Sequence, residues 1–118
     1  MTDAEIREYV DTEKALARIR GNNKLFKTLL THFLATRSQF DQLKQEIAAN
    51  DREAAAKSVH ALKGVSANLS MMKLYDLCPP FEALLKTNDD VTEAFSAYET
   101  TYEKTLESVN ALLQTFSS

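Results

Sequence analysis

Residues 58–69, SVHALKGVSANL, combine a histidine, a lysine and a glycine in a segment with helical spacing. His60 is followed by Lys63 and by Gly64, which is one of two glycines in the chain. An imidazole nitrogen can act as a nucleophile, and a nearby lysine can offset the charge of a bound phosphoryl group. Phosphoryl transfer relies mainly on positioning and charge stabilisation. The spacing is therefore consistent with phosphoryl transfer through His60.

His60 falls at the edge of an apolar stripe that contains Val59 and Leu62, so its ring is expected to face solvent. The surrounding positions on that face are mostly small, and we expect three of them, Ala56, Lys57 and Ala67, to contact a docking partner. Gly64 costs a helix about 1 kcal/mol relative to alanine, which predicts that it leaves room for an approaching molecule. The alternative is that His60 is an ordinary half-exposed histidine and Gly64 a helix-packing contact. The spacing alone does not decide between them, because so short a motif also occurs by chance.

The composition predicts an all-α domain. In 118 residues there are only two glycines and two prolines, while Ala, Leu, Glu and Lys are abundant. A formal net charge of −3 without a long basic run argues against nucleic-acid binding. The N-terminus is too polar for a signal peptide, and no apolar run approaches the roughly 20 residues of a membrane span. The single cysteine, Cys78, fits a reducing compartment. We expect a cytoplasmic, monomeric module without direct membrane insertion.

Apolar periodicity divides the chain into amphipathic helices joined by short turns. We expect an antiparallel up-and-down four-helix bundle, forming a single domain over 1–118, with a short additional helical segment at the N-terminus. The expected bundle helices are residues 23–49, 51–69, 71–86 and 90–116. The expected N-terminal caps are the capping-box pairs Thr2/Glu5, Asn50/Glu53 and Asp90/Glu93, together with Asp11 and Ser70.

Counting residues outward from the turns places two further side chains level with His60. Glu82 lies at that height on the helix that follows the turn near Ser70, and Gln42 lies at that height on the helix before the turn at Asn50. Both are expected to contribute to partner docking. Pro79-Pro80 is expected to kink or restart the helix that carries Glu82, because each proline removes a backbone donor.

Two metal-based alternatives fail on spacing. A di-iron bundle needs Glu-x-x-His pairs, but the residues three before His32 and His60 are Leu29 and Lys57. A zinc site built from both histidines and Cys78 would lack the close ligand spacing that such sites usually show. We expect no metal site in this chain.

The sequence resembles a histidine-containing phosphotransfer (HPt) domain. The five residues from His60 to Gly64 match that family's His-x-x-Lys-Gly pattern, and the similarity extends from about Asp11 to Leu113. It includes the segments DTEKALARIRGNNKLFKTLLTHF, NDREAAAKSVHALKG and FEALLK. The resemblance implies that His60 is the phospho-acceptor, that Lys63 stabilises charge and that Gly64 clears the docking surface. Ser70 departs from the pattern, because family members commonly have glycine at that position.

The resemblance also implies a phosphorelay role with response-regulator receiver domains as partners. His60 would accept a phosphoryl group from a receiver-domain aspartate and pass it to another receiver aspartate. The chain would need no cofactor of its own, and Mg²⁺ would be held by the partner receiver. Without an ATP site it would not be an autonomous enzyme, although a parent chain could be a membrane-bound bacterial hybrid sensor histidine kinase. Two alternatives stay open: a degenerate docking scaffold without phosphotransfer, and the phospho-accepting domain of a chemotaxis-type kinase.

Overall fold

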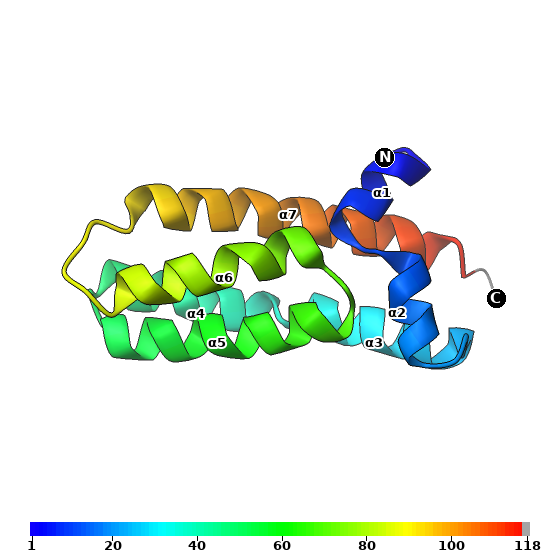
Figure 1. Cartoon of the computed structure of the whole chain (residues 1–118), viewed down its shortest axis with the longest axis horizontal. Helices are drawn as coiled ribbons and strands as arrows, with labels where there is room; N and C mark the ends of the chain where they lie inside the picture. The colour runs from blue at the N-terminus through cyan, green and yellow to red at the C-terminus, as the bar shows by residue number, and fades with distance from the viewer. Residues whose placement is uncertain (117–118) are drawn as a thin grey trace.

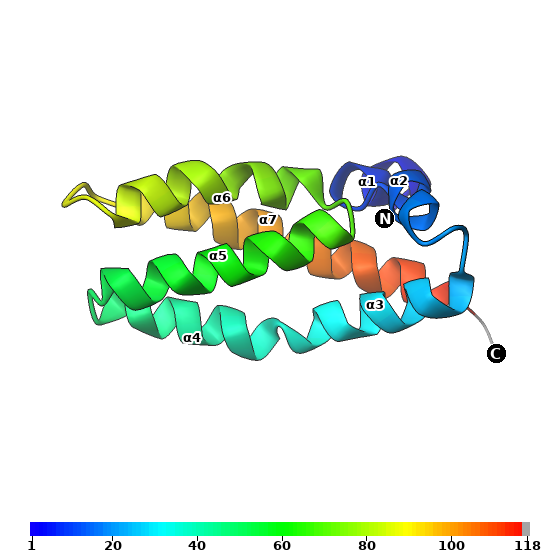
Figure 2. The ribbon, with the colours of Figure 1, turned by 60° about the horizontal axis from the view of Figure 1, so that its bottom comes forward.

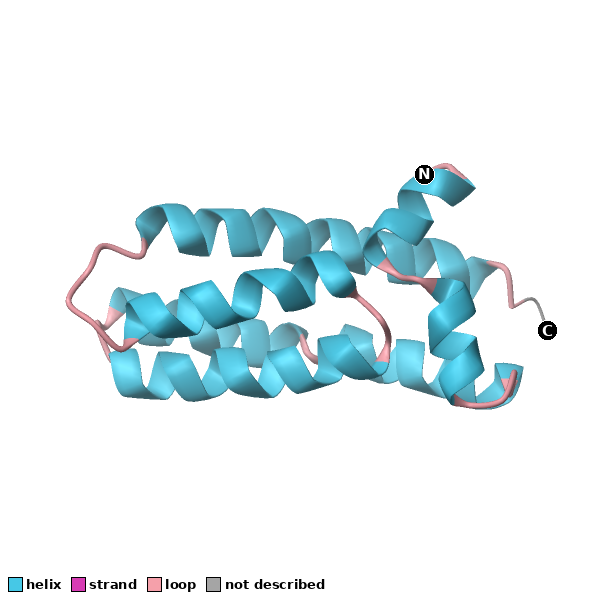
Figure 3. Cartoon of the chain, viewed as in Figure 1, coloured by secondary structure: helices cyan, strands magenta, loops and turns pink. Residues whose placement is uncertain are grey.

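The computed structural model describes residues 1–116, which form seven helices and no strand (Figure 3). The helices are α1 (Asp3–Tyr9), α2 (Thr12–Arg18), α3 (Asn23–Ala35), α4 (Arg37–Ala48), α5 (Arg52–Asn68), α6 (Met72–Leu85) and α7 (Thr92–Gln114). The expected all-α class is confirmed.

The long helices form an elongated bundle in which α3 and α4 follow one another along one edge (Figures 1 and 2). Helix α5 packs between α4 and α6, and α7 closes the bundle against α6 and α3. Consecutive arms run in opposite directions, as expected for an up-and-down bundle. Helix α1 packs against α7 and α6, while α2 lies beside the turn that joins α5 to α6. No helix within residues 1–116 combines the length and apolar character that a membrane span requires.

The helix expected over residues 23–49 is divided at Thr36, which separates α3 from α4. The Thr36 backbone N–H bonds to the carbonyl of Phe33 at 3.0 Å. Its buried hydroxyl also donates to that carbonyl at 2.6 Å and hydrogen-bonds the Tyr102 hydroxyl at 2.7 Å. A threonine hydroxyl can compete in this way with the regular helical pattern. The periodicity missed the break because Phe33 and Phe40 stay buried on either side of it.

Helix α6 is continuous through Pro79 and Pro80, so the expected restart at these residues is wrong. Both proline rings lie on the exposed side of the helix, whereas Cys78 and Phe81 are buried beside them. Packing of this apolar face holds the helix together where two backbone donors are missing. Burial also raises the pKa of the Cys78 thiol to about 11, which keeps it protonated near neutral pH.

The helix ends partly confirm the expected caps. Thr2 and Glu5 form a capping box, and Asp11 caps α2. Asp51, rather than Asn50, caps α5 by accepting from the Ala54 backbone N–H at 3.3 Å.

The remaining expected caps have other roles. Ser70 is not a helix N-cap: it adopts a left-handed φ of 52° just after α5, and the N-cap residue of α6 is Met71, which makes no side-chain capping bond. The Met71 N–H bonds to the carbonyl of Ser66 at 2.9 Å, the pattern of a Schellman C-cap, which favours glycine. Asp90 accepts from Thr92 instead of capping α7, whose N-cap residue is Val91.

Candidate functional site

His60 lies in the middle of α5 with its side chain 73% exposed. Its neighbours Val59 and Leu62 are fully buried in the bundle core. The 3.6-residue helical repeat turns His60 away from that core, so the fold presents the imidazole to solvent. The predicted orientation of His60 is therefore confirmed.

Glu82 on α6 lies directly beside His60. Its Oε1 is 3.4 Å from His60 Nδ1, and its side chain is only 13% exposed. This distance is longer than a normal hydrogen bond, and the buried Oε1 has no hydrogen-bond partner within residues 1–116. The predicted position of Glu82 level with His60 is confirmed, and its predicted role in partner docking stays a prediction.

A shallow groove of about 350 Å³ runs along the α5–α6 seam at His60. It is lined by Ala56, Lys57, His60, Ala61, Glu82 and Lys86. The sequence analysis placed four of these residues near the site and missed Ala61 and Lys86. Lys86 could have been found from Glu82, because the two are one helical turn apart.

Lys63 points along α5 toward the first turns of α6 and is partly buried. Its Nζ lies 6.0 Å from the centroid of the Tyr75 ring, at the outer limit of a cation–π contact. The ammonium group therefore rests over Tyr75, and it does not line the groove at His60. Tyr75 is a neighbour of the motif that the sequence analysis did not identify.

Gly64 is exposed, and a Cβ atom built on it would meet nothing within 4 Å. No close packing against the described part of the chain requires glycine here, nor does a left-handed backbone. The helix-packing explanation for Gly64 is therefore wrong. Glycine at this position destabilises α5 relative to alanine, and it leaves open space one turn from His60.

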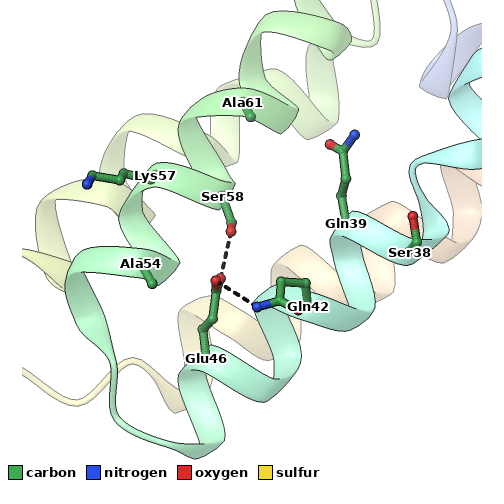
Figure 4. Close-up of a pocket in the computed structure, with 8 residues that line it drawn as sticks. All are labelled: Ser38, Gln39, Gln42, Glu46, Ala54, Lys57, Ser58 and Ala61. Carbon is green, nitrogen blue, oxygen red and sulfur yellow. Dashed lines mark hydrogen bonds between the residues drawn. The ribbon is translucent and has the colours of Figure 1, made fainter.

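Gln42 lies on the opposite side of α5, in a groove of about 450 Å³ between α4 and α5 (Figure 4). There its amide donates to Glu46 at 3.2 Å, and Glu46 also accepts from the Ser58 hydroxyl at 2.6 Å. Lys57 and Ala61 line this groove as well as the one at His60. The structure therefore does not bring Gln42 to the imidazole, and α5 forms a ridge between the two grooves.

Ala67 lies further along the His60 face of α5, in a third groove formed with α2 and α6.

Within the described residues, no three His, Cys, Asp or Glu side chains are close enough to share a metal ion. The site thus consists of an exposed imidazole, a neighbouring carboxylate, the partly buried Lys63 side chain beside Tyr75 and open space over Gly64. These groups can accept and stabilise a group delivered by another molecule.

Comparison with protein families identifies one match. The family model described as "Hpt domain" matches residues 28–115. No match was found among curated proteins or among solved structures. The matched residues include all of α4, α5, α6 and α7, and therefore the whole environment of His60.

Proposed function

Because the chain belongs to the Hpt domain family, whose members take part in phosphorelays, we propose that it is a phosphotransfer intermediate acting through His60. The phosphoryl donor is an aspartyl phosphate on a response-regulator receiver domain, and the acceptor is the aspartate of a second receiver. The partner receiver holds the Mg²⁺, and this chain supplies the histidine. The observation that carries the proposal is the exposed His60 ring, with Nδ1 facing a buried carboxylate of Glu82.

Glu82 selects the nucleophilic nitrogen of His60. In the neutral ring, a proton on Nδ1 faces the Glu82 carboxylate, so the lone pair remains on Nε2. Nε2 attacks the phosphorus of the aspartyl phosphate, the P–O bond breaks, and the aspartate leaves as a carboxylate. The ring now carries both the Nδ1 proton and the phosphoryl group, and Glu82 offsets its positive charge. The same steps in reverse deliver the phosphoryl group to a second aspartate.

Lys63 and Gly64 act around the phosphoryl group. The Lys63 side chain, resting over Tyr75, is long and flexible enough to turn toward a phosphoryl group on His60. Its ammonium group offsets the added negative charge. Gly64 leaves the approach to the ring free, because no side chain rises from α5 at that position.

The test is transfer from a phosphorylated receiver with Mg²⁺, followed by intact-mass measurement of this chain. We expect one acid-labile, base-stable phosphate on the wild type and none on His60→Gln. The matched control is His32→Gln, because His32 is the other histidine and is exposed on α3. Labelling of the His60 variant, or equal loss in both variants, would contradict the assignment.

The identity of the phosphoryl donor distinguishes the proposed phosphorelay role from the chemotaxis-type domain and from the docking scaffold. Labelling by a kinase ATP domain, with no labelling by any receiver, would assign the chain to the chemotaxis-type phospho-accepting domains. Receiver binding without labelling of His60 would indicate a docking scaffold that lacks the chemistry.

A further inference from the structure

We propose that the groove between α2, α5 and α6 is a second docking site for the receiver domain, and that it accepts an apolar receiver side chain flanked by carboxylates. This inference rests on the proposed function, because the receiver is the one whose aspartate exchanges phosphoryl with His60. The groove has a volume of about 440 Å³. It is lined by Lys14, Ala17, Arg18, Ala67, Ser70, Met72 and Tyr75.

The groove lies on the same face of α5 as the histidine. Ala67 is two helical turns from His60, about 10 Å along the axis, and Gly64 between them carries no side chain. A partner that covers His60 can therefore continue along α5 past the open space at Gly64 to reach the groove. The site is continuous with the proposed phosphotransfer surface.

The apolar part of the groove is unusually exposed. Met72 is 42% exposed and is one of three large hydrophobic side chains left exposed in residues 1–116. It lies next to the partly exposed ring of Tyr75, with Ala17 and Ala67 as small neighbours. Covering a flexible methionine with an apolar side chain of a partner is favourable, and methionine adapts well to different shapes.

The rim of the groove is positively charged although the chain carries a net charge of −3. Lys14 and Arg18 line it, Lys63 lies over Tyr75 at its edge, and no carboxylate is among the lining residues. None of the three cations forms an ion pair within the described part of the chain. Their charge is therefore free to act on a partner.

This charge fits the chemistry of the proposed partner. A receiver must bring the phosphorylated aspartate and the carboxylates that hold Mg²⁺ toward His60, so the surface it presents is acidic around the reaction centre. A basic groove beside His60 complements such a surface, and that complementarity favours correct orientation and fast association. An apolar receiver side chain packed on Met72 and Tyr75 would hold the complex at a second place besides His60.

Helix α2 forms one wall of this groove and lies before the family match, which begins at residue 28. Two contacts hold α2 in place. Arg18 Nη1 donates to the Ala67 carbonyl at 3.0 Å, and the Asp11 N–H donates to the Ser70 carbonyl at 3.1 Å. The groove is therefore formed before a partner arrives, and α2 can help to decide which receiver binds.

The test compares Met72→Ser and Lys14→Glu with the control variants Leu25→Ser and Lys24→Glu. Leu25 is also an exposed apolar residue at 40%, Lys24 is an exposed lysine, and neither lines the groove. Initial transfer rates are measured over a range of phosphorylated receiver concentrations, using a panel of purified receiver domains. Binding is measured separately by amide chemical shifts on titration with the same receivers activated by Mg²⁺ and beryllofluoride.

We expect the receiver concentration at half-maximal rate to rise about fivefold in Met72→Ser. A similar rise in Lys14→Glu should shrink as salt is added. The maximal rate should change by less than about twofold, since neither residue touches the imidazole. Amide signals of α2 and of the start of α6 should shift on titration.

Three results would overturn the docking proposal: groove variants that behave like the wild type, groove and control variants that are equally impaired, or receiver titrations that leave α2 unperturbed. Failure of the proposed function looks different. In that case the receivers shift the groove signals, while His60 of the wild type acquires no phosphate.

Discussion

Glu82 Oε1 on α6 lies 3.4 Å from His60 Nδ1 on α5, and this buried oxygen has no hydrogen-bond partner in the described residues. A buried acceptor without a partner is costly to maintain. Contacts of this kind at reactive sites are often long in the free protein and tighten when the partner binds. The pair therefore links the proposed nucleophile to a neighbouring helix and makes the packing of α5 on α6 part of the proposed chemistry.

Replacing Glu82 tests this link. Glu82→Ala should lower the transfer rate about tenfold, because Nδ1 loses the group that holds its proton and offsets the charge of the phosphorylated ring. Glu82→Gln keeps an acceptor oxygen and should lose less. Nitrogen chemical shifts of the His60 ring report the tautomer independently of transfer, and the fraction with the proton on Nδ1 should fall in Glu82→Ala. An unchanged tautomer would remove Glu82 from the mechanism.

Two substitutions of Gly64 should have different effects, one on the stability of the fold and one on the rate of phosphoryl transfer. Gly64→Ala is expected to raise the free energy of unfolding by about 1 kcal/mol, because alanine is the better helix former and the new methyl group meets open space. Gly64→Gln should slow transfer by obstructing the approach to His60. Denaturant unfolding and transfer kinetics measure the two effects. Ser96→Ala on the exposed side of α7 is the control for a gain in helix propensity alone. Transfer by Gly64→Gln at the wild-type rate would show that this space is not used.

Lys63→Ala should slow transfer about tenfold and leave the bundle folded, since the ammonium group would no longer offset the charge of the phosphoryl group. Lys63→Arg keeps the charge and should be less impaired. Lys27→Ala on α3 is the control, because Lys27 is an exposed lysine that lines neither the groove at His60 nor the groove at Ala67. Stopped-flow or quenched-flow transfer assays give the rates. Equal rates for Lys63→Ala and the wild type would exclude the proposed role of Lys63.

Arg52 should be important for stability rather than for chemistry. Its guanidinium donates to the backbone carbonyls of Leu84, Thr87 and Asp89 at 3.0, 2.8 and 2.7 Å. These bonds hold the end of α6 and the following turn against the start of α5. Arg52→Ala should lower the free energy of unfolding by about 2 kcal/mol, and Arg52→Lys should recover little, because a lysine cannot reproduce the branched donor geometry. Denaturant titration checks both values, and a loss below about 0.5 kcal/mol in Arg52→Ala would contradict this role.

Replacing Ser70 with glycine should increase the stability of the fold. Its φ of 52° lies in the left-handed region, which glycine adopts more easily than serine. We expect Ser70→Gly to raise the free energy of unfolding by about 0.5 kcal/mol, after allowance for the greater freedom of glycine in the unfolded chain. Asn50→Gly should gain less, because Asn50 has a similar φ of 56° but asparagine tolerates that region. A lower midpoint for Ser70→Gly in thermal unfolding would show that the serine side chain contributes more than its backbone strain costs.

Much of the site could be read from the sequence because it depends on local rules. Helical periodicity determined that Val59 and Leu62 are buried and that His60 faces outward. Counting residues across the turn near Ser70 placed Glu82 level with His60, and the structure confirms that they are neighbours. The scarcity of glycine and proline determined the all-α class.

The tertiary structure decided what depends on distant partners. Thr36 ends α3 because its hydroxyl meets both the Phe33 carbonyl and the Tyr102 hydroxyl, and Tyr102 comes from α7. Helix α6 continues through Pro79 and Pro80 while its opposite side packs in the core, which proline propensity alone cannot show.

The positions of Glu82, Gln42 and Ala67 around α5 also depend on how the helices pack. All three were predicted to contribute to partner docking. The structure distributes them around α5: Glu82 faces the imidazole on the α6 side, Gln42 lines the groove on the α4 side, and Ala67 lies at the α2 groove. Residue counting gives height along a helix, and height does not specify which neighbouring helix a side chain meets. The sequence by itself determined that His60 is exposed and on which helix it lies, and only the packing of the helices decided which side chains share its surroundings.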